Sequence, residues 1–100
     1  MAKGYWVAHV DVRDPEGYKS YVALLGDIFR KHHGRYLTRG GAFESMEGQN
    51  RSRHVVIEFP TYQAALDCYR SPEYGKAIAV RQANAAAELL VLEGYDGAQP

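Results

Sequence analysis

The stretch of residues 35–60 constrains the fold of this chain more than any other part of the sequence. Residues 54–59, HVVIEF, are rich in β-branched and aromatic residues and are followed by Pro60, which is typical of a strand and its end. Residues 36–46 also carry apolar residues suited to a strand, and the polar residues 47–53 between the two runs include turn formers. We therefore predict a long β-hairpin over residues 35–60.

A strand and a helix are predicted before this hairpin. Residues 4–13 alternate between an apolar and a mixed face, as a half-buried strand does. A helix should follow, because Asp14 can cap its first free N–H groups, Pro15 suits its first position and Glu16 complements its dipole. Apolar residues then recur at intervals of three and four, as on one face of a helix. We expect Gly34 to end this helix.

A broken helical region is predicted after the hairpin. Thr61 is a candidate N-cap for a first segment over residues 62–70. Ser71 and Pro72 then repeat the capping pattern of residues 14–16, so a second segment should cover residues 72–84.

The order of these elements predicts the fold class. Residues 88–93 supply the last strand, and residues 95–100 are expected to be a disordered tail. The order β-α-β-β-α-β is the α+β, ferredoxin-like arrangement. Right-handed crossovers then give a four-stranded antiparallel sheet of order 4-1-3-2 with both helices on one face. We expect residues 1–100 to form one such domain.

Alternation along the strands predicts which side chains face the helices. The expected core-facing residues are Trp6, Ala8, Val10, Val12, Val55, Ile57, Phe59, Leu90 and Leu92. The expected residues of the other face are Tyr5, Val7, His9, Asp11, His54, Val56, Glu58, Leu89, Val91 and Glu93. That second face is too apolar to stay in water, so we expect a homodimer in which two copies pack sheet to sheet.

Composition narrows the class of partner. Twelve basic residues balance twelve acidic ones, which argues against a nucleic-acid surface or a polybasic membrane contact. The apolar runs are too short to cross a bilayer, and the N-terminus lacks the apolar region of a signal peptide. The one cysteine, Cys68, has no partner for an internal disulfide, which favours a cytoplasmic location.

Several motifs together resemble one family. They are GYWVAHVDV at 4–12, DPEGY at 14–18, RGGAFE at 39–44, RHVVIEFP at 53–60 and YRSPEY at 69–74. In combination they resemble the bacterial family called domain of unknown function 1330 (DUF1330). The resemblance implies a dimeric α+β barrel, a superfamily that also holds cofactor-independent monooxygenases, muconolactone-isomerase-like enzymes and haem-degrading proteins. It implies no particular activity.

Two polar positions are candidate catalytic residues. Arg39 precedes Gly40 and Gly41, and this pair of glycines indicates either a structural bulge or a place where a ligand, such as an anion, approaches the backbone. His9 either transfers a proton or forms a hydrogen bond within the dimer interface. Arg51 and Arg53 flank the predicted turn, where we expect them to be solvated.

Metals and cofactors have no clear sequence signal. Asp11, His54 and Glu58 share the expected face of His9, but no tight ligand spacing is present, and we assign no metal site. The phosphate-binding, dinucleotide-binding and zinc-protease motifs are absent from the sequence, so we name no cofactor.

Tyrosines near the helices are candidate ligand contacts. Tyr18, Tyr69 and Tyr74, with Gly40 and Gly41, are the residues we expect to bind a substrate between sheet and helices. The alternative is core packing, with the hydroxyl groups reaching water.

Two hypotheses follow for the function. The first is a small-molecule enzyme of the cofactor-independent monooxygenase or isomerase kind, in which Arg39 holds an anionic or aromatic ligand and His9 moves a proton. The alternative is a non-catalytic homodimeric ligand-binding or interaction module. The two differ in whether Arg39 and His9 should converge on one cavity that solvent can reach.

Overall fold

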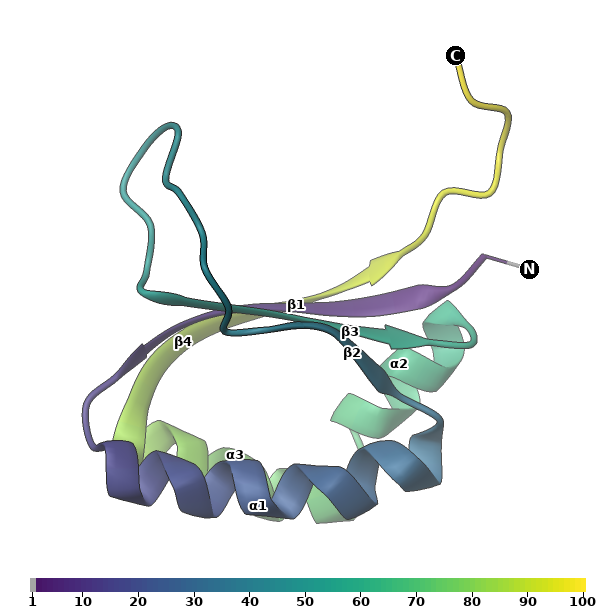
Figure 1. Ribbon diagram of the computed structural model, residues 1–100. Coiled ribbons are helices and arrows are strands. Elements are labelled where there is room, and N and C mark those ends of the chain that lie inside the picture. The colour runs from purple at the N-terminus through teal and green to yellow at the C-terminus, as the bar shows by residue number, and fades with distance from the viewer. Residues whose placement is uncertain (1) are drawn as a thin grey trace.

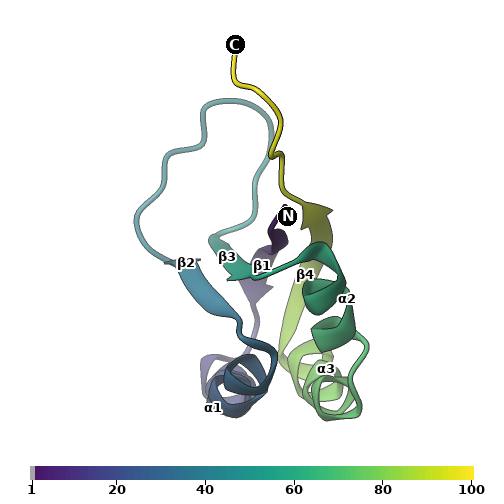
Figure 2. The same cartoon turned by 90° about the vertical axis from the view of Figure 1, so that its right-hand side faces the viewer.

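The computed structural model describes residues 2–100, which form one antiparallel sheet covered on one side by helices (Figure 1). The strands are β1 (Gly4–Val12), β2 (Arg35–Arg39), β3 (Arg53–Phe59) and β4 (Ala85–Glu93). The helices are α1 (Pro15–His32), α2 (Tyr62–Tyr69) and α3 (Pro72–Asn84). The strand order β2-β3-β1-β4 confirms the predicted topology, and all helices lie on the same face (Figure 2).

The start of α1 is formed as the sequence predicts, but its end is not. The side chain of Asp14 accepts hydrogen bonds from the backbone N–H of Glu16, at 3.1 Å, and of Gly17, at 3.3 Å. At the other end, His33 and not Gly34 takes the left-handed conformation, with φ of 63°. Gly34 serves another purpose: a β-carbon there would press on the ring of Phe59, so glycine lets the chain pass close to the core.

The predicted long hairpin is wrong in its first strand. β2 ends at Arg39, and residues 40–52 form a loop that stands away from the uncovered face of the sheet (Figure 1). Gly40, with φ of 72°, turns the chain out of the strand. Asn50 then holds the loop together, because its side-chain amide donates to Ser45 Oγ and to the Glu47 carbonyl. Phe43, expected in the strand, is therefore exposed on this loop.

The break between α2 and α3 confirms the prediction. Thr61 Oγ1 accepts from the N–H of Ala64 at 3.0 Å, and Ser71 Oγ accepts from the N–H of Tyr74 at 3.2 Å. Each hydroxyl thus caps a separate helix. No helix in the described part of the chain is both long and apolar enough to cross a membrane.

The predicted faces of β1 and β3 are correct, whereas those of β4 are reversed. Trp6 pairs with Val91 and Ala8 with Leu89, so Leu89 and Val91 face the helices. Leu90 and Leu92 lie on the uncovered face, 55% and 42% exposed. The physical reason is Glu88: placing Leu90 in the core would also turn Glu88 inward, and burying an unpaired carboxylate is costly.

Trp6 lies at the centre of the core between sheet and helices. It is 1% exposed, and its indole Nε1 donates to the Ala65 carbonyl at 2.9 Å. The rings of Phe29, Phe59 and Tyr74 surround it, with centroids 4.7–5.4 Å away. This aromatic cluster fixes α1, α2 and α3 against β1.

Candidate functional site: an arginine-containing pocket

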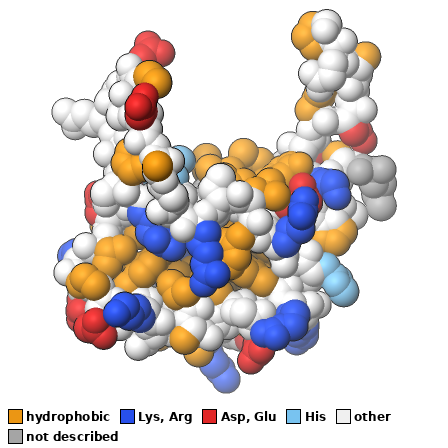
Figure 3. Space-filling view, viewed as in Figure 1, with side chains coloured by type: hydrophobic (Ala, Val, Ile, Leu, Met, Phe, Trp, Pro, Cys, Tyr) orange, Lys and Arg blue, Asp and Glu red, His pale blue; other side chains and the backbone are white. Residues whose placement is uncertain are grey.

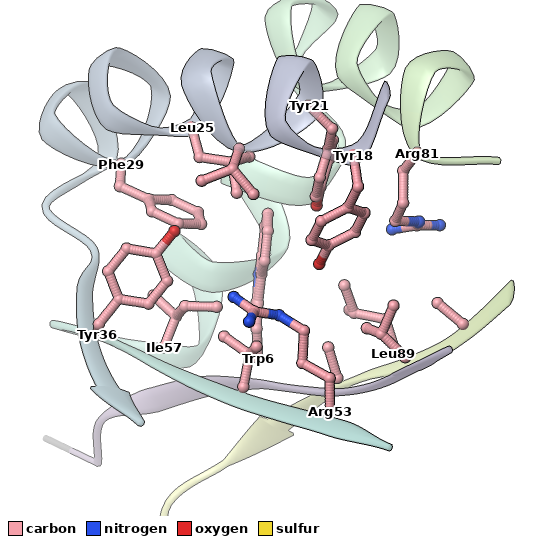
Figure 4. A pocket seen from close by; sticks show the side chains of 15 residues that line it. Trp6, Tyr18, Tyr21, Leu25, Phe29, Tyr36, Arg53, Ile57, Arg81 and Leu89 are labelled. Atoms are coloured by element: carbon pink, nitrogen blue, oxygen red, sulfur yellow. The ribbon is translucent and has the colours of Figure 1, made fainter. Parts of the chain in front are cut away.

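A pocket opens beside this aromatic cluster, between the sheet and the helices α1 and α3 (Figure 4). Its lining is mostly apolar and includes Trp6, Leu25, Phe29 and Leu89. The polar residues of the lining are Tyr18, Tyr21, Tyr36, Arg53 and Arg81. The cavity encloses about 30 Å³, which is room for about two water molecules or one small polar group.

Arg81 enters the pocket from α3 and is held by a buried chain of hydroxyl groups. It is 8% exposed, and its Nη1 donates to Tyr74 Oη at 2.9 Å. Tyr74 Oη lies 2.7 Å from Tyr21 Oη. Arg81 follows Tyr74 by two helical turns, so both side chains lie on the same face of α3. Burial raises the pKa of both tyrosines, so both remain neutral hydroxyls at pH 7.

Arg53 enters the pocket from the first position of β3. Its guanidinium lies over the ring of Tyr18, 5.6 Å from the centroid. Its Nε atom is buried and has no hydrogen-bond partner among residues 2–100. Across the same residues, no carboxylate forms an ion pair with Arg53 or with Arg81. The pocket therefore contains two cations without a protein counter-ion.

Gly40 lies against the guanidinium of Arg53. A β-carbon at residue 40 would overlap Nη1 and Cζ of Arg53, whereas one at Gly41 would meet nothing within 4 Å. The close approach expected at the glycine pair thus occurs at Gly40, and the group that approaches is an arginine of the chain itself. The irregularity in the pairing of β2 lies earlier, between Tyr36 and Thr38.

The structure does not bring Arg39 and His9 together. Arg39 is exposed on the edge strand β2, where its guanidinium stacks on the ring of Tyr36 at 4.5 Å. His9 lies on the uncovered face of the sheet, with its Nδ1 atom 2.8 Å from His54 Nδ1. Neither residue lines the pocket. The two therefore do not converge on one cavity within this chain.

The predicted ligand-binding tyrosines take different positions. Tyr18 lines the pocket, as does Tyr21. Tyr74 lies behind the lining and holds Arg81, and Tyr69 packs edge-on against Trp6 at 5.8 Å. The three predicted tyrosines thus lie between the sheet and the helices. Only Tyr18 lines the pocket, whereas Tyr74 and Tyr69 pack behind its lining.

Sequence reasoning missed both pocket arginines. A signal for Arg53 was present, because it alternates with Val55, Ile57 and Phe59, which all face the core. Its place beside the turn suggested a solvated side chain, and that expectation is wrong. Arg81 had no comparable signal, because only the tertiary packing of α3 buries it.

The uncovered face carries a second polar cluster, near the base of the loop. Arg51 donates to Asp11 at 2.8 Å and to Glu88 at 2.5 and 2.7 Å. Hydrogen bonds from Ser52 lower the pKa of Asp11, and the hydrogen bond from Arg51 lowers that of Glu88. Phe43 of the loop packs edge-on against His54 at 4.5 Å. Within residues 2–100, no group of three or more His, Cys, Asp or Glu side chains is placed to hold a metal ion.

A family model matches nearly the whole chain. Residues 3–95 match the model of the family described as domain of unknown function (DUF1330). The chain belongs to the DUF1330 family. No curated protein matches the chain.

Solved structures with the same fold come from several organisms. A protein of unknown function from Rhodopseudomonas palustris is 21% identical, with a TM-score of 0.75 over 96% of this DUF1330 chain and 85% of its own. SnoaB, a cofactor-independent oxygenase from Streptomyces nogalater, is 13% identical, with a TM-score of 0.64 over 97% of each chain. A dimeric ferredoxin-like protein of unknown function from Thermobifida fusca is 14% identical, with a TM-score of 0.55 over 91% of this chain and 92% of its own. At these identities the likeness concerns the fold.

Proposed function

We propose that this DUF1330 protein binds a small organic molecule in the pocket between sheet and helices and acts on it as a cofactor-independent monooxygenase or isomerase. The observation that carries the proposal is the pocket itself, an apolar cavity into which a few buried polar groups project. Small-molecule sites usually share this apolar lining with a few placed polar groups, although at about 30 Å³ this cavity must widen to hold a whole ligand. The fold shared with the oxygenase SnoaB is consistent with this class of reaction but supports it only as an analogy.

The pocket is suited to stabilising negative charge on a reacting molecule. In both kinds of reaction a proton is removed from an activated carbon atom and passes to a base, which leaves an enolate or related anion on the substrate. Arg53 and Arg81 place fixed positive charge where such an anion would form, in a site of low polarity. No histidine or carboxylate lines the pocket in the described chain. The role of His9 in proton transfer stays a prediction, since His9 lies on the opposite face of the sheet.

Leucine substitutions at two alanines of β4 test whether the pocket is the ligand-binding site. Ala87 lines the pocket, whereas Ala86 pairs with Asp11 and so lies on the uncovered face. Ala87→Leu should abolish binding of small aromatic molecules, followed through the fluorescence of the single tryptophan, Trp6, which also lines the pocket. Ala86→Leu should leave binding intact. Equal binding by both variants would place the site elsewhere.

A second proposal concerns assembly, and the apolar character of the uncovered face supports it. Tyr5, Val7, Val56, Leu90 and Leu92 lie on this face. In Figure 3 apolar side chains gather on it between the loop of residues 40–52 and the C-terminal tail. We propose that a second copy covers this surface to form a homodimer, as the fold neighbour described as dimeric suggests.

The oligomeric state in solution tests the homodimer. Leu90→Glu should convert a dimer into a monomer in light scattering after size exclusion, because it places a charge on the apolar face. Leu24→Glu alters an equally exposed leucine on α1, away from this face, and should leave the dimer intact. A wild-type chain that is monomeric at high concentration would refute the proposal.

The alternative is a homodimeric binding module without catalysis. It would show ligand binding that Ala87→Leu abolishes, but no turnover of any bound compound. Product analysis of each bound compound in air, by mass spectrometry, separates the two functions.

A further inference from the structure

We propose that the pocket selects an anionic ligand, a small apolar or aromatic carboxylate whose charged group is bound by Arg53, with Arg81 adding positive charge from the other side of Tyr18. This inference rests on the proposed function of the pocket and names the class of its ligand. It assigns the anion to residues other than Arg39, which lies outside the cavity.

The charge balance of the pocket is the first argument. Three other arginines are paired with acids: Arg30 with Asp27, Arg35 with Glu58, and Arg51 with both Asp11 and Glu88. The arginines outside the pocket that form no such pair within residues 2–100, Arg13, Arg39 and Arg70, are exposed to solvent. Arg81 is 8% exposed and the Nε atom of Arg53 is buried, and yet neither arginine has an acidic partner among residues 2–100. A buried cation without a counter-ion is costly, so a bound anion would relieve this cost.

The tyrosines of the pocket do not supply the missing charge. Burial raises the pKa of Tyr21 and of Tyr74, so neither forms a phenolate near neutral pH. Their hydroxyl groups instead hold Arg81 in a fixed position, through the contact of Tyr74 Oη with Nη1. The charge of Arg81 is therefore held in place and has no negative partner among residues 2–100.

The free donor of Arg53 is the second argument. Its Nε–H is buried without a partner in the described chain, although buried donors are almost always hydrogen-bonded. Arg53 rises from the sheet and Arg81 descends from α3, on opposite sides of Tyr18 (Figure 4). A planar carboxylate is the natural acceptor for a guanidinium donor, since its two oxygens match the geometry of the N–H groups.

The size and lining of the cavity restrict the rest of the ligand. The volume of about 30 Å³ admits a carboxylate group as it stands, whereas the apolar body of a larger acid requires side chains of the lining to move apart. Beyond the arginines the lining is aliphatic and aromatic, with Leu25, Phe29 and Leu89. These surfaces offer few partners to a sugar or a second charged group. The ligand class is therefore a monocarboxylate with an apolar body.

Matched pairs of acids and primary amides test the inference. Acetate and acetamide, benzoate and benzamide, and phenylacetate and phenylacetamide have nearly the same shape within each pair, and only the acid is charged at pH 7. Titration calorimetry on the wild-type protein should show that at least one acid binds about tenfold or more tightly than its amide, the difference expected for a hydrogen bond to a charged group.

Two variants then assign the preference to Arg53. Arg53→Gln should bring the affinities of acid and amide together while the amide still binds. Arg39→Gln removes the same charge from the sheet edge and should leave the preference unchanged. Circular dichroism confirms that each variant is folded. Arg53 is the better target than Arg81, whose removal would leave Tyr74 without its buried partner.

The possible results separate this inference from the proposal on which it rests. Equal affinity for acid and amide in the wild type, with binding lost in Ala87→Leu, would overturn the anion inference and leave the pocket as the site. An acid preference that persists in Arg53→Gln would also overturn it. If no compound of either kind binds, both the anion inference and the small-molecule function are refuted.

Discussion

The backbone of Gly40 lies directly against the guanidinium of Arg53, and the absence of a side chain at residue 40 is what makes room for that charge. Gly40 also has φ of 72°, a conformation that residues with a β-carbon rarely adopt. One residue thus both turns the chain out of β2 and sets the position of a pocket arginine.

Gly40→Ala should therefore affect stability and the pocket together. The left-handed backbone costs about 1 kcal/mol in the free energy of unfolding, and the methyl group displaces the Arg53 guanidinium. We expect a lower urea midpoint and a weaker preference for acids over amides. Gly41→Ala is the matched control, because a β-carbon there meets nothing within 4 Å. Equal behaviour of the two variants would contradict the role given to Gly40.

Tyr74→Phe should destabilise the fold by about 1–3 kcal/mol. The substitution removes the hydroxyl that accepts from Arg81 Nη1 and contacts Tyr21 Oη, and it leaves both groups buried. Tyr69→Phe is the control, since Tyr69 Oη makes no hydrogen bond within residues 2–100. Urea denaturation of both variants measures the difference. Similar midpoints would mean that the hydroxyl chain contributes little.

Glu73 should make stability depend on pH under acidic conditions. The hydrogen bond from His32, followed by that from Lys31, lowers the pKa of Glu73 from 4.5 to about 2. Because the folded pKa is depressed, the stabilisation is present above pH 4.5 and is lost as the pH falls toward 2.

The comparison of wild type with Glu73→Gln measures this effect. The difference in melting temperature between the two should be fully present above pH 4.5 and should shrink between pH 4.5 and 2. The control is Glu44→Gln, on the exposed loop, which should show a small difference at every pH. A difference for Glu73→Gln that stays constant across this range would refute the assignment.

Cys68 should be unreactive in the folded protein. It is fully buried, and burial raises the pKa of its thiol to about 12, so the thiolate needed for alkylation is scarce at pH 8. Iodoacetamide should label the urea-unfolded chain rapidly and the native chain many times more slowly, as mass spectrometry can follow. Rapid labelling of the native chain would mean that α2 opens readily.

The parts of the fold that depend on local chemistry could be predicted from the sequence. The caps at Asp14, Thr61 and Ser71 and the order of elements are of this kind, since each rests on neighbouring residues. The faces of β4 could not be assigned as easily, because residues 89–92 are all apolar and fit either side. The first strand of the hairpin was overestimated because apolar residues such as Phe43 lie on an exposed loop.

The candidate site was less predictable than the fold. Tyr18 was identified, but Arg53 was expected in solvent and Arg81 was overlooked. Their burial results from the packing of β3 and α3 under α1, and no window of sequence contains both. Arg39 was singled out because two glycines follow it, and His9 because it lies within a largely apolar strand. The sheet places these two residues on opposite faces.

The loop of residues 40–52 physically links the helix-covered face of the sheet to the uncovered face. At its start Gly40 contacts Arg53, which faces the pocket, and further along Phe43 contacts His54, which faces the other way. One loop thus meets two adjacent residues of β3 on opposite sides of the sheet. If a bound anion shifts Arg53 and thereby the loop, and if the proposed homodimer also contacts this loop, then ligand binding and dimerisation are coupled. Thermodynamic reciprocity then requires assembly to alter ligand affinity by the same factor.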